Sequence, residues 1–221
     1  MFCNYFTAFL KEYCSKNAIF VSVEEFDQYR SIGGVSEGVY KESGSRFLAF
    51  AYPVESEEEA RALLQEKRKE YYDARHHCLA FRIGYKGDVW RASDDGEPSG
   101  SAGKPILGQI DSAGLSDIAV IVVRYFGGIK LGIPGLIRAY KTATADALSK
   151  AQIITKTAAK RYNVEFDYLQ MNSVMKVLKE MNLSPRAQDF GENCSLEVAV
   201  RLSSVPIFKE KLEKIAKLKE I

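Results

Sequence analysis

Residues 117–140 read DIAVIVVRYFGGIKLGIPGLIRAY, and this stretch decides the fold. Its first part, DIAVIVVRYF, is apolar and rich in β-branched residues, so it predicts a buried central strand. The strand runs into a loop that contains Gly127, Gly128 and Gly132. A helical pattern of apolar residues then continues over residues 136–150. The sequence therefore predicts a strand, a glycine-rich loop and a helix in direct succession.

The start of this helix has the features of an anion-binding site. Pro134 suits the first helical turn, where its missing N–H costs nothing. No Ser, Thr, Asp or Asn stands just before it to cap the first backbone N–H groups, which are then available to an anion. The alternative is that the glycines serve only tight turns and close helix–strand packing. The candidate contacts for a phosphate or an RNA backbone are Arg124, Gly127, Gly128, Lys130, Gly132 and Arg138.

Two aromatic residues, Tyr125 and Phe126, end the predicted strand. Side chains alternate along a strand, so one of the two should face outward. An exposed ring beside basic residues suits stacking on an unpaired base, although a place in the core is the simpler expectation.

An acidic turn, DDGEPSGSAG at residues 94–103, precedes the central strand. Asp94, Asp95 and Glu97 together suggest three interpretations. They can cap backbone N–H groups, pair with the basic residues of the glycine loop, or bind a hard cation such as magnesium. We expect the structural roles, and the sequence indicates no metal and no cofactor. If the turn docks on the uncapped helix start, it already occupies the anion site.

The same turn offers the residues of a hydrolase, which is the alternative function. Ser99 and Ser101 lie in SGSAG, but Ser99 stands where the GxSxG nucleophile motif requires glycine. A nucleophilic serine also needs a base, and the chain has only His76 and His77. Their rings should point to opposite faces of a strand. We therefore predict no catalytic residue.

Other functional classes lack their signatures. The glycine loop contains no GxxxxGK[ST] phosphate-binding motif and no dinucleotide-binding fingerprint. The formal net charge of +2 is too small to indicate nucleic-acid binding by bulk charge, so an anionic partner must meet a local patch. The lysines of residues 209–219 alternate with glutamates, as on a solvated helix face.

The composition is that of a protein of the cytoplasm. The four cysteines form no CxxC pair, so we expect reduced thiols. No apolar run approaches the roughly 20 residues that span a bilayer, and residues 1–20 lack the basic start of a signal peptide. We expect no membrane partner. The sequence gives no oligomeric state.

The remaining pattern predicts an α+β protein. Before the acidic turn we expect a hairpin around residues 42–45 and a helix that Ser56 and Glu59 open as a capping box. After a connection at residues 151–158, a second domain has the order βαββα, a ferredoxin-like arrangement without its final strand. Its predicted elements are strands at 162–168, 186–190 and 195–202 and helices at 171–181 and 207–219.

The two central motifs resemble the signature of the YigZ/IMPACT family. KESGSRFLAFAYPV at 41–54 and YYDARHHCLAFRIG at 71–84 match as well, so the resemblance covers nearly all of the chain from Tyr29 onward. His76 matches the histidine of the family motif. The chain departs from the family at Ser101, where Thr is usual, at His77, where Asn is usual, and at Pro134, where a small residue or Gly is usual.

The resemblance implies a fold and a role. It implies an N-terminal domain like the second domain of a small-subunit ribosomal protein and a ferredoxin-like C-terminal domain, a tandem similar to the last two domains of elongation factor G. It also implies a part in regulating translation, with RNA, the ribosome or a translation-associated protein as partner. The expected divisions are an extension at 1–28, either a short amphipathic helix or poorly ordered, and domains at 29–156 and 157–221.

Overall fold

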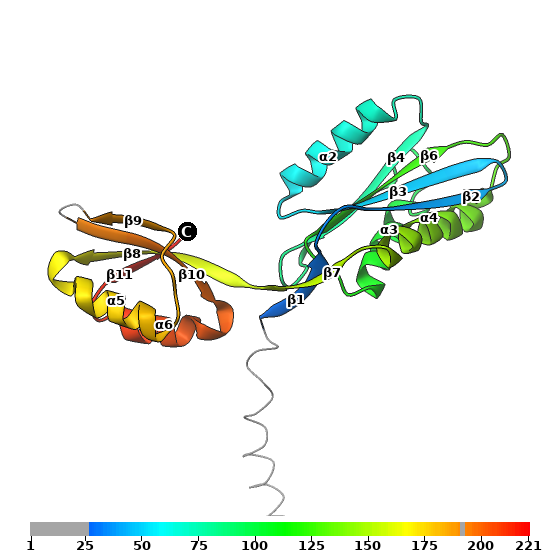
Figure 1. Cartoon of the computed structure of the whole chain (residues 1–221). Helices are drawn as coiled ribbons and strands as arrows, with labels where there is room; N and C mark the ends of the chain where they lie inside the picture. The colour runs from blue at the N-terminus through cyan, green and yellow to red at the C-terminus, as the bar shows by residue number, and fades with distance from the viewer. Residues whose placement is uncertain (1–26, 191–192) are drawn as a thin grey trace, which may run out of the picture. The chain divides into compact units, whose positions relative to one another are not determined.

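The computed structural model describes residues 27–190 and 193–221. It divides into two compact units, one of them Tyr29–Lys156 and the other Thr157–Ile221 together with the described residues before Tyr29 (Figure 1). Both units combine helices with an antiparallel sheet, so the α+β class holds. Residues 1–26, which include Cys3 and Cys14, lie outside the described residues, and so do the expectations for the N-terminal extension that concern them.

The first unit is built on a five-stranded sheet in the order β2-β3-β6-β4-β5, in which all neighbours are antiparallel. The predicted central strand is β6, and seven of its eight residues are buried because the sheet is covered on both faces. The hairpin predicted around residues 42–45 joins β2 to β3. The strands are β2 (Ser36–Glu42), β3 (Ser45–Pro53), β4 (His76–Ile83), β5 (Val89–Ser93) and β6 (Ile118–Tyr125).

Helices cover the two faces of this sheet (Figure 1). Helix α2 (Glu57–Glu70) packs on one face, and Ser56 caps it by accepting a hydrogen bond from the backbone N–H of Glu59 at 3.2 Å. Helices α3 (Gly103–Ser112) and α4 (Gly132–Ser149) pack on the other. α4 is the helix predicted after the glycine loop. The prediction lacked α3.

The connection predicted at residues 151–158 contains a strand. Residues Ile153–Thr157 form β7, which pairs with β1 (Gln28–Ile32) in a separate two-stranded sheet. Side chains fix this sheet to the start of β6: the hydroxyl of Tyr29 lies 2.5 Å and the ammonium of Lys156 3.1 Å from the carboxylate of Asp117. The sequence predicted a short connection here and no strand, because the partner strand β1 lies far away in the sequence.

The second unit has a four-stranded sheet in the order β11-β8-β10-β9 with two helices on one face. The predicted βαββα order was incomplete, because a final strand makes it βαββαβ. The elements are β8 (Ala159–Asp167), η1 (Tyr168–Gln170), α5 (Met171–Glu180), β9 (Ala187–Phe190), β10 (Asn193–Arg201), η2 (Leu202–Ser204), α6 (Val205–Leu212) and β11 (Lys217–Glu220).

The predicted helix at 207–219 was therefore wrong over its second half. α6 ends at Leu212, and the chain turns back so that Leu218 pairs with Val164 of β8. The apolar spacing from Phe208 through Ile215 to Leu218 fits a helix. It also fits a short helix followed by an edge strand whose lysines face outward. The sequence alone does not separate these two structures, because the strand forms only by pairing with β8.

Candidate functional site

A cavity of about 400 Å³, here called the α4 cavity, lies in the first unit where α4 begins. It brings together six residues that the sequence singled out, among them members of both the acidic turn and the glycine loop, and five that it did not. Its lining residues are Arg75, His76, Glu97, Pro98, Arg124, Phe126, Lys130, Leu131, Gly132, Ile133 and Leu136.

The N-terminus of α4 is uncapped, as predicted. The residue at its cap position, Leu131, makes no side-chain hydrogen bond to the helix. Gly132 has a φ of +68°, a left-handed conformation that favours glycine, and it begins the helix beside the cavity. The positive end of the helix dipole therefore adjoins the α4 cavity.

The acidic turn caps a different helix. Asp94 accepts backbone hydrogen bonds from Gly100 at 2.8 Å, Ala102 at 3.0 Å and Gly103 at 2.8 Å, so it closes the start of α3. Burial alone would raise the pKa of Asp94. The three N–H donors and nearby Lys104 outweigh burial and lower that pKa overall. Asp94 thus fills a structural role and leaves the start of α4 open.

Asp95 holds the two histidines in place. It adopts a positive φ of +46°, and its carboxylate accepts hydrogen bonds at 2.6 Å from the backbone N–H of His77 and from Arg68. Its backbone carbonyl lies 2.7 Å from Nδ1 of His76. A carbonyl can only accept, so Nδ1 of His76 carries the hydrogen and Nε2 is an acceptor in the neutral ring.

The two histidine rings point to opposite faces of β4, as the alternation predicted. His76 lines the α4 cavity. Nε2 of His77 lies 3.0 Å from the carbonyl of Tyr71, just beyond α2 on the other face. Burial lowers the pKa of His77 more than the bond to Tyr71 and nearby Asp95 raise it, so this ring is a neutral structural group.

A buried ion pair forms the back of the cavity. Arg124 donates a hydrogen bond of 2.6 Å to Oε1 of Glu97, and the hydroxyl of Tyr140 donates to the same oxygen at 2.8 Å. Burial raises the pKa of Tyr140, so the hydroxyl keeps its proton. The Arg124 guanidinium also lies over the rings of Phe47 and Phe126, 5.4 and 5.7 Å from their centroids. Of the predicted pairs between the acidic turn and the basic residues around the glycine loop, the structure thus contains the pair of Glu97 with Arg124.

The three basic candidates differ in their surroundings. Arg124 is largely neutralised by Glu97, and Arg138 pairs with Glu42 rather than with the acidic turn, outside the cavity. Within the described ranges, the side chains of Lys130 and of the additional lining residue Arg75 have no ion-pair partner. Lys130 and Arg75 are therefore the cations available to a ligand.

The glycines of the loop have two different roles: one permits close packing and another lines the α4 cavity. A Cβ on Gly127 would lie 1.9 Å from the carbonyl carbon of Gly44, so this glycine permits the loop to contact the β2–β3 turn. Gly128 has a φ of +89° and open space around it. Gly132 lines the α4 cavity. Of the two aromatic residues, Phe126 faces outward with 49% of its surface exposed, and Tyr125 donates a hydrogen bond to Asp73.

The two serines of the acidic turn are not placed as nucleophiles beside His76. Ser101 is fully buried, and its hydroxyl donates a hydrogen bond of 2.6 Å to the carbonyl of Pro98. Ser99 is exposed and lies outside the α4 cavity. The part of the chain that the structure describes contains no group of three or more His, Cys, Asp or Glu residues able to hold a metal ion. Nor does it contain a helix long and apolar enough to cross a membrane.

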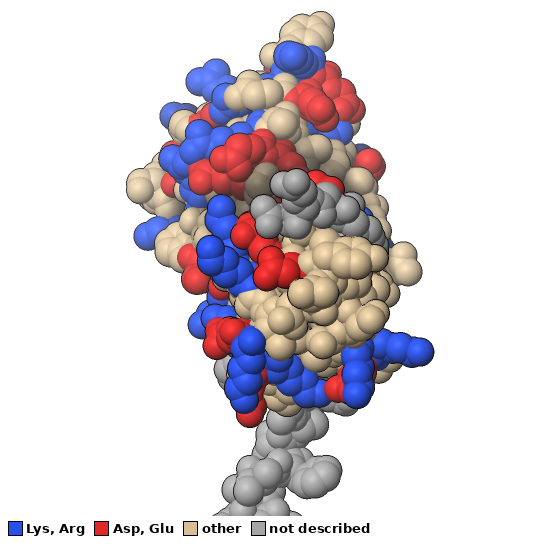
Figure 2. Space-filling model, turned by 90° about the vertical axis from the view of Figure 1, so that its left-hand side faces the viewer, with Lys and Arg blue, Asp and Glu red and all other residues tan. Residues whose placement is uncertain are grey.

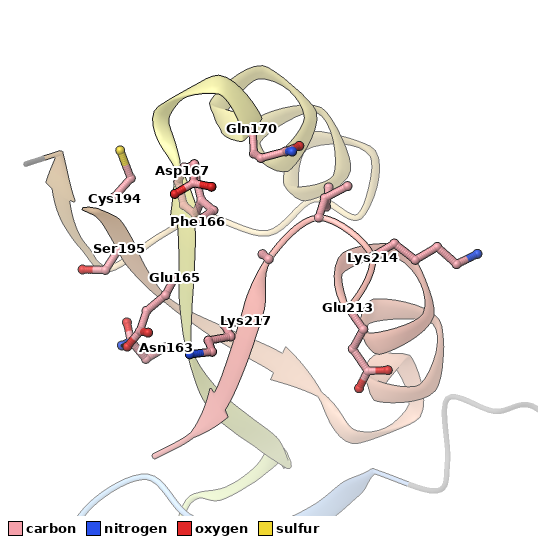
Figure 3. A pocket seen from close by; sticks show the side chains of 12 residues that line it. Asn163, Glu165, Phe166, Asp167, Gln170, Cys194, Ser195, Glu213, Lys214 and Lys217 are labelled. Atoms are coloured by element: carbon pink, nitrogen blue, oxygen red, sulfur yellow. The ribbon is translucent and has the colours of Figure 1, made fainter. Parts of the chain in front are cut away.

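A larger cavity of about 750 Å³ lies in the second unit and is lined by residues of β8, β10 and β11, by Gln170 and by the segment that follows α6 (Figure 3). Its lining charges are mixed: Glu165, Asp167 and Glu213 oppose Lys214 and Lys217, and the side chain of Lys214 extends away from β8. The face shown in Figure 2 likewise carries basic and acidic side chains side by side. The mixed charges of the larger cavity do not favour an anionic ligand, whereas the α4 cavity has more cationic than anionic lining side chains.

Several lining residues were missed by sequence reasoning. Arg75 directly precedes His76, and Ile133 directly precedes Pro134, so both lie beside recognised positions. Pro98, Leu131 and Leu136 are apolar, and nothing in the sequence separates an apolar residue of a cavity wall from one of the core. Arg75 could have been predicted from its position, because it directly precedes His76, the first residue of β4 and a residue of the recognised motif.

Three comparisons relate the chain to known proteins. The Impact N-terminal domain family matches residues 43–148. The chain is 34% identical over 166 residues to the IMPACT family member YvyE of Bacillus subtilis, covering 75% of this chain and 76% of that protein. It is 36% identical over 170 residues to the IMPACT family member YigZ of Escherichia coli, covering 76% and 83%. A crystal structure of a hypothetical protein, 31% identical, matches with a TM-score of 0.70 and covers 89% of this chain and 98% of that one.

Proposed function

Because this chain belongs to the IMPACT family, we propose that it is a cytoplasmic binding protein that regulates translation by contacting RNA, alone or within a ribosome or another translation complex. The role in translation is the one that the family resemblance implies. The observation that carries the RNA contact is the α4 cavity, in which an uncapped helix start meets two cations without ion-pair partners in the described part of the chain.

The charges of the cavity support an anionic ligand. Three of its lining side chains, Arg75, Arg124 and Lys130, are cationic, and Glu97 is the single carboxylate among them. Glu97 and Arg124 form an ion pair whose charges largely cancel, so Arg75 and Lys130 leave the cavity with a net positive charge. Backbone N–H groups at a helix start and unpaired Lys or Arg side chains are common phosphate contacts in protein–RNA interfaces.

The test is RNA binding measured over a range of salt concentrations. Each lost phosphate contact should weaken binding to all RNA sequences alike and flatten the salt dependence by roughly one unit of slope. We expect this from Lys130→Ala and from Arg75→Ala. Lys141→Ala is the matched control, because Lys141 is an exposed lysine of α4 outside the cavity. Unchanged affinity and slope in the Lys130→Ala/Arg75→Ala double variant would reject the proposed contact.

A further inference from the structure

The α4 cavity has an apolar side as well as a cationic one. Phe126 exposes 49% of its surface and Ile133 exposes 52%, and Pro98 lines the cavity with them. A flat apolar group can therefore pack against these side chains beside the cationic groups. Aromatic rings with a neighbouring guanidinium are the usual surfaces on which unpaired bases stack.

The cationic side of the α4 cavity contains Arg124. Arg124 is more than nine-tenths buried, lines the cavity and is bound through Nη1 to Glu97. Its Nε has no hydrogen-bond partner among the residues that the structure describes. A buried donor without a partner costs stability. Lys130 and the start of α4 complete this side.

His76 adds a hydrogen-bond acceptor. Its Nδ1–H is directed to the carbonyl of Asp95, so in the neutral ring Nε2 has a lone pair. Nε2 lies 3.9 Å from Oε1 of Glu97, too far for a hydrogen bond. A ligand hydroxyl can therefore donate to His76. The 2′-hydroxyl of ribose is such a donor, and it is the group by which proteins distinguish RNA from DNA.

The size of the cavity limits the ligand. At about 400 Å³ it lies near the lower end of small-molecule clefts, which hold roughly 300–1,000 Å³. It therefore suits one nucleotide and not a length of helix. In a duplex the bases are stacked inside and cannot reach Phe126, whereas an unpaired base can be turned outward.

We propose that the α4 cavity binds one unpaired ribonucleotide of an RNA strand. Its phosphate lies at the start of α4 near Lys130, its base lies against Phe126, and its 2′-hydroxyl donates to Nε2 of His76. The inference rests on the proposed RNA contact and narrows it from an RNA backbone in general to single-stranded RNA.

The test compares three labelled probes by fluorescence anisotropy: a short single-stranded RNA, the same sequence as DNA, and the RNA annealed to its complement. The single-stranded RNA should bind most tightly. Phe126→Ala should weaken its binding by about tenfold, the low end for one lost base–aromatic stack. Trp90→Ala is the matched control, since Trp90 is an aromatic residue of the same unit, 56% exposed and outside the cavity. His76→Leu should abolish the preference for RNA over DNA, and its urea midpoint verifies that it is folded.

The outcomes separate the two proposals. Equal affinity for duplex and single strand, together with no effect of Phe126→Ala, overturns the nucleotide-pocket inference. The proposed function survives that result if Lys130→Ala still flattens the salt dependence. If none of the three probes binds, both proposals are wrong. If a preference for RNA over DNA persists unchanged in folded His76→Leu, the assignment of the hydroxyl contact is overturned.

Discussion

The guanidinium of Arg124 donates a hydrogen bond of 2.6 Å to the carboxylate of Glu97, and their side chains are only 7% and 3% exposed. The two residues are 27 positions apart in the sequence, one on β6 and one in the acidic turn. The pair therefore attaches the turn to the central strand and builds the back of the α4 cavity. The same pair makes Arg124 a structural residue first and a ligand contact second.

Arg124→Ala should destabilise the first unit strongly. The variant leaves the Glu97 carboxylate buried without its cation, which typically costs about 3–5 kcal/mol. Urea denaturation measures the loss. Arg124→Ala/Glu97→Gln should recover part of it because the buried charge is gone. Arg91→Ala, at an exposed ion pair with Glu57, should cost no more than about 1 kcal/mol. Equal stability of Arg124→Ala and the unmodified protein would contradict the role given to the pair, and it would restore the simpler expectation that Arg124 is a free phosphate contact.

Asp94 should contribute stability that depends on pH. The folded state lowers its pKa, so the contribution is complete above the ordinary aspartate value of roughly 3.9 and is lost as the pH falls through the lowered folded pKa. Asp94→Ala should therefore be less stable than the unmodified protein at neutral pH, by about 0.5–2 kcal/mol for a lost helix cap. The difference should shrink below pH 4. Urea midpoints from pH 7 to pH 3 test this, and a difference that stays constant across the range would count against the cap.

Asp95→Asn should lower the melting temperature equally with and without magnesium. Its carboxylate accepts hydrogen bonds from Arg68 and from the backbone of His77, and both are weakened when the charge is removed. Thermal unfolding is recorded for the variant and the unmodified protein in magnesium and in chelator. A melting temperature that magnesium raises in the unmodified protein but not in the variant would instead indicate a bound cation.

Gly127→Ala should destabilise the first unit more than Gly34→Ala does. The added Cβ would lie 1.9 Å from a backbone carbon of Gly44 and 2.2 Å from the backbone nitrogen of Ser45, so the loop or the β2–β3 turn must move. Overpacking of this kind costs about 1–3 kcal/mol or more. Nothing lies within 4 Å of a Cβ built on Gly34, which makes it the control. The two urea midpoints are compared, and equal midpoints would show that the contact is dispensable.

Residues 29–156 should fold when expressed alone. This segment contains the whole five-stranded sheet, its three helices and all but the outermost residues of the β1–β7 pair. We expect a circular dichroism spectrum of a folded α+β protein and a single cooperative unfolding transition. An unfolded segment would mean that the division predicted from the sequence does not mark an independent domain.

Local patterns in the sequence were sufficient for several elements. The β-branched run of residues 118–125 predicts β6, Ser56 with Glu59 predicts the start of α2, and Pro134 with the following apolar spacing predicts α4. Each of these signals lies within one element and acts through the backbone preferences or the burial of that element alone. The family resemblance was likewise carried by contiguous motifs, and the comparisons confirm it.

The tertiary structure alone decided what depends on residues far apart in the chain. Helix α3 begins where Asp94 accepts hydrogen bonds from its first backbone N–H groups. Strand β11 forms because its residues pair with β8, with Leu218 opposite Val164. The α4 cavity forms because the strand order β6-β4 sets His76 beside Arg124. Glu97 then neutralises that arginine, while Lys130 has no ion-pair partner among the described residues. The sequence determined which residues carry charge and which elements they lie on. Which charges neutralise one another follows from distances of a few ångströms, and folding alone sets those distances.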